Sequence, residues 1–544
     1  MRNFILLILL TLPLFSVSSQ STDKPKLVVG IVVDQMRYEF LHRFDEHYTD
    51  GGFKRLTSKG FSFRNAHFNY IPTKTGPGHA SVYTGTTPRV HGVIANDWYE
   101  KVQNKMIYCV EDLDASGVGG SGKIGQRSPR NLLSSTITDE LKIHYQNRSK
   151  VIGLSLKDRG SILPAGHNPD GAYWFDEASG NFMTSSFYTN VLPDWVGKFN
   201  SRKLSTQYTN GKWETLMDIN TYVESARDNR DYENAFFMDL EPTFPYKLNS
   251  IRKTFGVHNT LVYSPFGNTI LVDFAELAIE KEQLGKDEIT DFLAISFSST
   301  DKIGHEFGPY SKEIQDTYVR LDRDLDRLFK YLDEQVGEGE WTVFLTADHA
   351  IAELPKYLNE QKQSVNYFDN KQNQPLLKKS VDEEFSATGI IENISNRQVF
   401  LNHDLLRDQN IDQVEVKKYI VDLLLEMEGV SSAYDTREIE RYHDTNLDVG
   451  MLSAGINSKA SGDVAYTLLP GWLSDYNLYH KGTNHGTGYS YDTHVPMIFY
   501  GWGIKKGSTV NYHPITDIAP TISTLLNIKF PSGCTGQPAT ELFD

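Results

Sequence analysis

Five short runs of apolar residues recur along the chain, separated by longer segments in which polar and apolar positions mix. The runs cover residues 26–33, 151–156, 292–297, 341–346 and 495–500. Uninterrupted apolar runs of this length are typical of parallel strands that are covered on both faces. We therefore expect each run to form a strand of one buried sheet.

Two segments between these runs carry a helical pattern. One extends from Pro129 to Tyr145 behind Ser128 as its N-cap, and the other extends from Glu313 to Glu334. Alternating strands and helices predict an α/β fold, with a doubly wound, mostly parallel sheet and helices on both faces. Folds of this kind carry their functional sites at the carboxyl ends of the strands.

Two stretches interrupt the alternation. Residues from about 165 to 270 are rich in aromatic residues, Asn and Pro, and we interpret them as an inserted loop region or cap. Residues 357–464 contain a helical pattern from Val414 to Glu428 and short strand candidates, which predicts a small α+β insert. The catalytic core then comprises residues 20–356 and 465–544.

The N-terminus has the composition of a secretory signal peptide. Residues 1–19 contain one basic residue, a short apolar stretch and small residues at the end. A membrane anchor is the alternative, but the stretch is short for a bilayer. We expect a periplasmic or secreted protein without stable membrane association. The formal net charge of −16 argues against nucleic acid as a partner.

The chain contains two cysteines, Cys109 and Cys534. In an exported protein they are able to pair and tie the C-terminal segment to the first third of the chain. Two independent thiols are the equal alternative, because the sequence does not give the separation that a disulfide requires. The oligomeric state also stays open.

Residues with metal-ligand chemistry stand at or just after the predicted strand ends. They are Asp34, the pair Asp301 and His305, the pair Asp348 and His349, and the later His485. A single Asp and His pair is more often a helix cap beside a surface histidine. Six such residues in this arrangement instead predict two Zn²⁺ sites. Thr75 lies in a turn of small residues that resembles a helix start and is able to present a hydroxyl to the metals.

These motifs resemble the alkaline phosphatase superfamily. Asp34, the Thr75 turn, Asp301-x-x-x-His305, Asp348-His349 and Asn484-His485-Gly486-Thr487 follow the order seen in that superfamily. Within it, the chain is most similar to bacterial phosphate-irrepressible alkaline phosphatases of the PafA type. These are relatives of the nucleotide pyrophosphatases/phosphodiesterases. The similarity covers almost the whole mature chain.

The resemblance implies a role for each site residue. One Zn²⁺ is held by Asp301, His305 and His485, and the second by Asp34, Asp348 and His349. Thr75 is the nucleophile, with its oxygen on the second metal, and a covalent phospho-threonine forms during turnover.

Three further residues are expected to bind the phosphoryl group. Lys157 and Arg159 follow a strand, and alternation along an extended segment aims both to one side. The resemblance makes them, together with Asn96, ligands of the phosphoryl oxygens. Two solvated basic residues and a turn asparagine are the plain alternatives. Because Lys157 occupies the region where other alkaline phosphatases bind Mg²⁺, we predict no Mg²⁺ site.

The predicted function is an exported di-zinc alkaline phosphatase that hydrolyses small-molecule phosphate monoesters. Lys157 and Arg159 favour monoesters. A monoester presents two extra anionic oxygens to these cations, whereas a diester presents only one. A phosphodiesterase or nucleotide pyrophosphatase on the same two metals is the alternative. A non-catalytic metal-binding or glycan-binding protein would not require the complete set of ligands together with Thr75.

Overall fold

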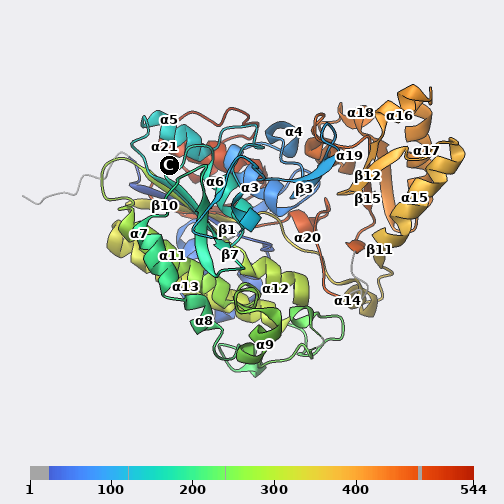
Figure 1. Ribbon diagram of the computed structural model, residues 1–544. Helices are drawn as coiled ribbons and strands as arrows, with labels where there is room; N and C mark the ends of the chain where they lie inside the picture. The colour runs from blue at the N-terminus through green and yellow to red at the C-terminus, as the bar shows by residue number, and fades with distance from the viewer. Residues whose placement is uncertain (1–23, 121, 239, 476–480, 544) are drawn as a thin grey trace, which may run out of the picture.

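The computed structural model describes residues 24–543 except 121, 239 and 476–480, so the predicted signal peptide lies outside the described residues. Its centre is one ten-stranded sheet (Figure 1). In spatial order the strands are β18 (Gly507–Pro514), β2 (Phe61–His67), β17 (Met497–Gly501), β10 (Trp341–Thr346), β1 (Leu27–Val33), β9 (Asp291–Phe297), β6 (Val151–Ser155), β7 (Gly171–Asp176), β8 (Asn181–Ser185) and β5 (Gly117–Val118).

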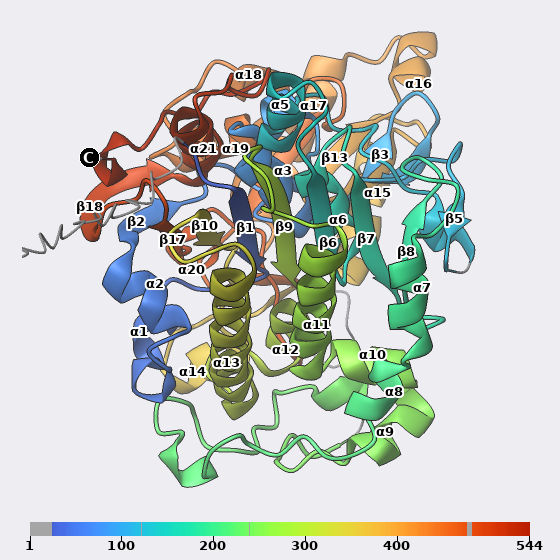
Figure 2. The same cartoon turned by 90° about the vertical axis from the view of Figure 1, so that its left-hand side faces the viewer.

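Four of the five apolar runs form the parallel centre of the sheet, as predicted. β1 pairs in parallel with β9 on one side and with β10 on the other, and β6 extends the parallel arrangement beyond β9 (Figure 2). Every residue of these four strands is buried. The fifth run forms β17, but this strand is antiparallel to β10 and β2. The expected parallel orientation of this run was wrong, because its apolar residues reflect burial between β10 and β2, which an antiparallel strand inside the sheet also has.

Helices cover both faces of the sheet, which confirms the doubly wound α/β class (Figures 1 and 2). One face carries α11 (Phe266–Lys281), α12 (Ser299–Phe307) and α13 (Lys312–Gln335), and the other carries α3 (Thr75–Thr84), α5 (Ile137–His144), α6 (Asp158–Ala165) and α21 (Ile518–Leu526). α13 matches the helix predicted over 313–334. In the part of the chain that the structure describes, no helix is long and apolar enough to cross a membrane.

The other predicted helix begins later than expected. Residues 129–136 form turns, and α5 starts after Thr136, whose hydroxyl accepts a hydrogen bond from the Asp139 amide. The Asp139 carboxylate in turn accepts from the Thr136 amide. This reciprocal capping box satisfies two free amides at once, so Thr136 and not Ser128 sets the helix start.

Part of the expected aromatic-rich insert belongs to the central sheet. β7 pairs in parallel with β6, and β8 pairs antiparallel with β7. β7 is buried along its whole length, including Trp174. The segment after β8 forms short helices and loops that pack outside the sheet beside α11 (Figure 2).

The second insert has its own sheet and its own hydrophobic core. Four strands lie in the order β12 (Ile391–Ser395), β13 (Gln398–Leu401), β15 (Val464–Leu468) and β14 (Val430–Asp435). The helices α15 (Asn370–Glu384) and α17 (Gln413–Glu426) accompany them. The core of this unit reaches from Phe368 to Trp472, so it continues past residue 464. Figure 1 shows the unit projecting from one side of the central sheet.

Both cysteines are free thiols. Cys109 is buried and Cys534 is half-buried. Of the two alternatives that the sequence left open, the structure has the independent thiols.

Candidate metal centre and nucleophile

The predicted site residues converge at the carboxyl edge of the central strands. Asp34 directly follows β1, Asp348 follows β10, and Lys157 follows β6. Asp301 lies in the first turn of α12, which begins just after β9. Since β10, β1, β9 and β6 are neighbours in the sheet, their ends deliver all four side chains to one place.

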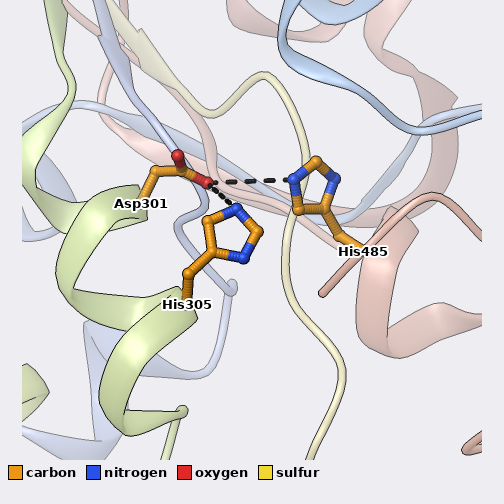
Figure 3. Close-up of side chains that lie close together, drawn as sticks. All are labelled: Asp301, His305 and His485. Atoms are coloured by element: carbon orange, nitrogen blue, oxygen red, sulfur yellow. Dashed lines mark ion pairs between the residues drawn. The ribbon is translucent and has the colours of Figure 1, made fainter. Parts of the chain in front are cut away.

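The first predicted metal group is assembled from a helical turn and a distant loop. Asp301 and His305 stand one turn apart on α12, with His305 Nε2 3.0 Å from Asp301 Oδ1. His485 Nε2 lies 3.8 Å from the same oxygen. In Figure 3 both imidazole rings approach this carboxylate. The three donor atoms lie within 4.8 Å of one another, which is a spacing that suits a single cation.

The second predicted group surrounds His349. Its Nε2 lies 3.5 Å from Asp34 Oδ1 and 3.6 Å from Asp348 Oδ2. Asp348 and His349 are neighbours in the chain, and both face this point. Asp301 also comes close, since its carboxylate shares a 4.8 Å cluster with Asp34 and His349. The two groups are adjacent, because the His349 and His485 rings stack with centroids 3.5 Å apart.

Two carboxylate oxygens of the second group are buried without a hydrogen-bond partner. They are Asp34 Oδ1 and Asp348 Oδ2, the two atoms that face His349 Nε2. A buried anionic oxygen that accepts no hydrogen bond is costly unless a cation compensates it. The residues present therefore fit a metal ion at this point.

All three histidines are fixed in the tautomer that a metal ligand requires. The Nδ1 atoms of His305, His349 and His485 lie 2.8, 3.0 and 2.7 Å from the carbonyls of Thr483, Ala350 and Thr73, respectively. A carbonyl oxygen only accepts, so each Nδ1 carries the proton. Each Nε2 is then a lone-pair donor directed into the site. His79 differs, because both of its nitrogens bond within the protein, to Thr75 O and Ser296 Oγ. This agrees with a structural role for His79.

Burial and crowding shape the protonation of these groups. Burial, followed by neighbouring carboxylates, raises the pKa of Asp34 and raises that of Asp348 well above its usual value. Burial also lowers the pKa of His349 and His485 well below the usual histidine value. For Asp301, burial is outweighed by His305 and Lys157, which hold its pKa well below the usual range. Neutral imidazoles among crowded carboxylates form a donor set suited to divalent cations.

Thr75 is the first residue of α3, as the small-residue turn predicted. Its side chain is buried, and Oγ1 lies 3.4 Å from His349 Nε2 of the second group. Gly78 allows this close approach, since a Cβ there would lie 2.1 Å from the Asp348 carbonyl oxygen. Asn96 Oδ1 accepts a hydrogen bond from the Gly76 amide at 2.7 Å. This bond holds the Asn96 amide beside the threonine.

Lys157 lies between the two groups. Its Nζ donates to Asp34 Oδ2 at 2.7 Å and to Asp301 Oδ2 at 2.5 Å. Arg159 donates to the Tyr108 hydroxyl at 2.8 Å. The expected extended alternation of these two residues was wrong, because Lys157 caps α6 and Arg159 lies in its first helical turn. Arg159 is nevertheless close enough to Asp34 to stabilise its ionised form.

Two further residues hold the site together and were missed from sequence. Gln35 donates through Nε2 to Asp301 Oδ1 at 2.7 Å and through its amide to Asp348 Oδ1 at 3.1 Å. Its backbone has a positive φ of 71°, which is uncommon for a residue other than glycine. Asp492 accepts from the amides of Gly486 and Thr487 and so orders the loop that carries His485. The one available signal was that Gln35 directly follows a strand-end aspartate.

Comparisons with known proteins agree with this arrangement. The family described as type I phosphodiesterase / nucleotide pyrophosphatase matches residues 28–492, so the chain belongs to this family. A protein of Elizabethkingia meningoseptica named alkaline phosphatase PafA is 43% identical over 96% of this chain and 95% of its own. A protein of Myroides odoratus named calcium-transporting ATPase is also 43% identical, over 97% and 96%. The crystal structure of alkaline phosphatase PafA superposes with a TM-score of 0.92 at 42% identity, over 96% of this chain and 99% of that one.

Within the family, the chain is a hydrolase of the PafA type of alkaline phosphatases. The resemblance inferred from the strand-end motifs is thereby confirmed, and so is the α/β fold class. Of the two candidate metal-binding groups, one consists of the predicted Asp301, His305 and His485. The other consists of Asp34, Asp301 and His349, with Asp301 in the place predicted for Asp348.

Proposed function

We propose that this protein is an exported phosphomonoesterase that hydrolyses small phosphate monoesters through a phospho-threonine on Thr75. The observation that carries the proposal is the position of Thr75 Oγ1. It lies 3.4 Å from His349 Nε2, at the start of α3 and beside two adjacent groups of metal-ligand side chains. A helix N-terminus favours an anion, so α3 directs its amides toward a phosphoryl group at Thr75.

We propose two Zn²⁺ ions, one held by Asp301, His305 and His485 and one by Asp34, Asp348 and His349. Bound zinc supplies Lewis-acid polarisation and eases the deprotonation of a hydroxyl or water. No Mg²⁺ is proposed, because the Lys157 ammonium already lies between Asp34 and Asp301.

The chain's own residues then account for the chemical steps. The Thr75 hydroxyl loses its proton and its oxygen attacks phosphorus. The ester P–O bond breaks, and the alcohol leaves with the electron pair and takes up a proton. Water next attacks the phospho-threonine, the bond to Thr75 breaks, and Thr75 regains a proton as inorganic phosphate is released. Lys157, Arg159 and the Asn96 amide hold the non-bridging oxygens during both transfers.

A phosphodiesterase on the same site is the second candidate, supported by the family to which the chain belongs. Lys157 argues for the monoester. Its ammonium is buried among carboxylates, where it favours the additional negative charge that a monoester brings. ATP hydrolysis, suggested by the name of the Myroides relative, is compatible with the same site because the terminal phosphoryl group of ATP also carries this charge.

Metal analysis combined with turnover of paired substrates tests the proposal. The purified full chain should contain two zinc ions, hydrolyse p-nitrophenyl phosphate well and bis-p-nitrophenyl phosphate poorly. It should lose activity to a chelator and recover it with added zinc. Full activity in an exhaustively metal-free preparation would refute the mechanism, and a preference for the diester would favour the phosphodiesterase.

A further inference from the structure

A cleft beside the metal centre is lined by two cations from different parts of the fold. Its walls include Lys74, Arg397 and His485. Lys74 directly precedes Thr75 in the chain, Arg397 belongs to the second insert, and His485 belongs to the first metal group. The cleft encloses about 80 Å³. This is several times the space that one water molecule requires, so a phosphoryl or carboxylate group fits in it.

The two cationic groups converge on the Cβ position of Gly486. A Cβ atom on this glycine would lie 2.9 Å from Arg397 Nη2 and 3.5 Å from Lys74 Nζ. Gly486 also has a φ of 122°, in the region that favours glycine. A side chain here would displace one of the cations, so the glycine makes their convergence possible.

Arg397 reaches the cleft through an unusual hairpin turn. Asn396 and Arg397 connect β12 to β13, and both have positive φ, of 52° and 58°. Such two-residue turns favour Asn followed by Gly, because glycine adopts this backbone without strain. The arginine is held in place by Asn396 Nδ2, which donates to Asp97 O at 2.7 Å, and by its own Nη2, which donates to the Gly486 carbonyl. The insert is thus fastened to the loop that carries His485.

Within the part of the chain that the structure describes, neither cation has a carboxylate counter-ion. Among the described residues, no carboxylate lies within ion-pairing distance of Lys74 or Arg397, and the Lys74 ammonium has no hydrogen-bond acceptor. Asp492, a buried acid whose charge acts on both cations, already accepts hydrogen bonds from the Gly486 and Thr487 amides. Two converging cations that pair with no described carboxylate, on the wall of a cleft, form a site for an external anion.

We infer that Lys74 and Arg397 form a second anion subsite, which selects phosphate monoesters whose leaving group carries another phosphate or carboxylate. This inference rests on the proposed function. The cleft adjoins His485, a residue of the first group, whereas the nucleophile Thr75 stands against His349 of the second. An alcohol that departs on the side away from Thr75 therefore extends toward the two cations.

Three substrates built on the same three-carbon chain test the subsite: propyl phosphate, 3-phosphonooxypropanoate and propane-1,3-diyl bisphosphate. The holoenzyme should have a higher kcat/KM for the two substrates that carry a second anionic group than for propyl phosphate. The double variant Lys74→Met, Arg397→Gln should reduce the preference for the bisphosphate over propyl phosphate by about 10- to 100-fold. Arg407→Gln, an exposed arginine of the same insert, is the control and should leave the ratio unchanged. The bisphosphate and the carboxylate, compared with each other, identify which anion the subsite favours.

Calorimetric binding of two stable phosphonates gives a readout independent of turnover. Propane-1,3-bisphosphonate should bind the holoenzyme more tightly than propylphosphonate, and Arg397→Gln alone should remove most of this difference. An unchanged preference and an unchanged binding difference in the variants would overturn the inference, even if every monoester is hydrolysed. Absence of turnover on all three substrates would instead overturn the proposed function.

Discussion

Replacement of Lys157 by methionine separates the monoesterase from the phosphodiesterase interpretation. The side chain is 7% exposed, and its Nζ lies 2.7 and 2.5 Å from carboxylates of both metal groups. Methionine keeps an apolar stem of similar length and removes the charge. A monoester dianion carries one more unit charge than a diester, and the ammonium stabilises that charge in a site with little water.

The magnitude follows from the separation of the charges. One unit charge about 4 Å from an ammonium is worth about 4 kcal/mol at an effective dielectric constant of about 20. Asp34 and Asp301 already neutralise part of the ammonium charge, so its stabilisation of the additional phosphoryl charge is set at about 2–4 kcal/mol. The loss of one preorganised hydrogen-bond donor falls in the same range. Lys157→Met should then reduce kcat/KM for a monoester about 30- to 1,000-fold more than for a diester.

The assay compares p-nitrophenyl phosphate with methyl p-nitrophenyl phosphate, which share a leaving group, and measures the zinc content of the same samples. Lys150→Met is the matched control, because Lys150 immediately precedes β6, at the end of the strand opposite Lys157, and its Nζ lies 3.8 Å from Glu282 Oε2. This variant should behave as the parent. Equal losses on both esters would refute the reasoning, and an accompanying loss of zinc would show that Lys157 supports the metal groups instead.

Three other variants or measurements examine different parts of the site. Thr75→Ala should lose most monoester turnover while retaining zinc, and Thr75→Ser should keep much of it; parental rates in Thr75→Ala would show that the nucleophile is misassigned. Gln35→Leu removes the hydrogen bond to Asp301 and should weaken zinc affinity or activity about 10- to 100-fold; an unchanged affinity in a chelator competition, with unchanged activity, would contradict this role. Thiol titration of the denatured, unreduced protein should find two free cysteines per chain, and a titre of zero would mean that they pair.

Much of the site could be predicted because its residues occupy local positions that the sequence reveals. Asp34 and Asp348 end apolar runs, and the ends of neighbouring parallel strands must meet at one edge of the sheet. Asp301 and His305 are four residues apart, which places them on the same face of a helix. In these cases a short stretch of sequence already determines where the side chain points.

Other features depended on contacts between distant segments. Gln35 acquires its role from Asp301 and Asp348, far along the chain, and its position after a strand-end aspartate does not by itself predict these hydrogen bonds. The direction of β17 depends on the path of the chain between strands. The start of α5 depends on which of the two candidate N-caps, Ser128 or Thr136, forms the reciprocal capping hydrogen bonds.

The sequence by itself determined the fold class, the strand-end ligands and the family resemblance, because short stretches of sequence show which segments are buried and which residues share a helix face. Only the tertiary structure decided that the second insert contributes Arg397 to the cleft beside His485. It also decided that Lys157 lies between the carboxylates of both groups. Charges brought together by folding are set by long-range packing, which no spacing along the chain encodes.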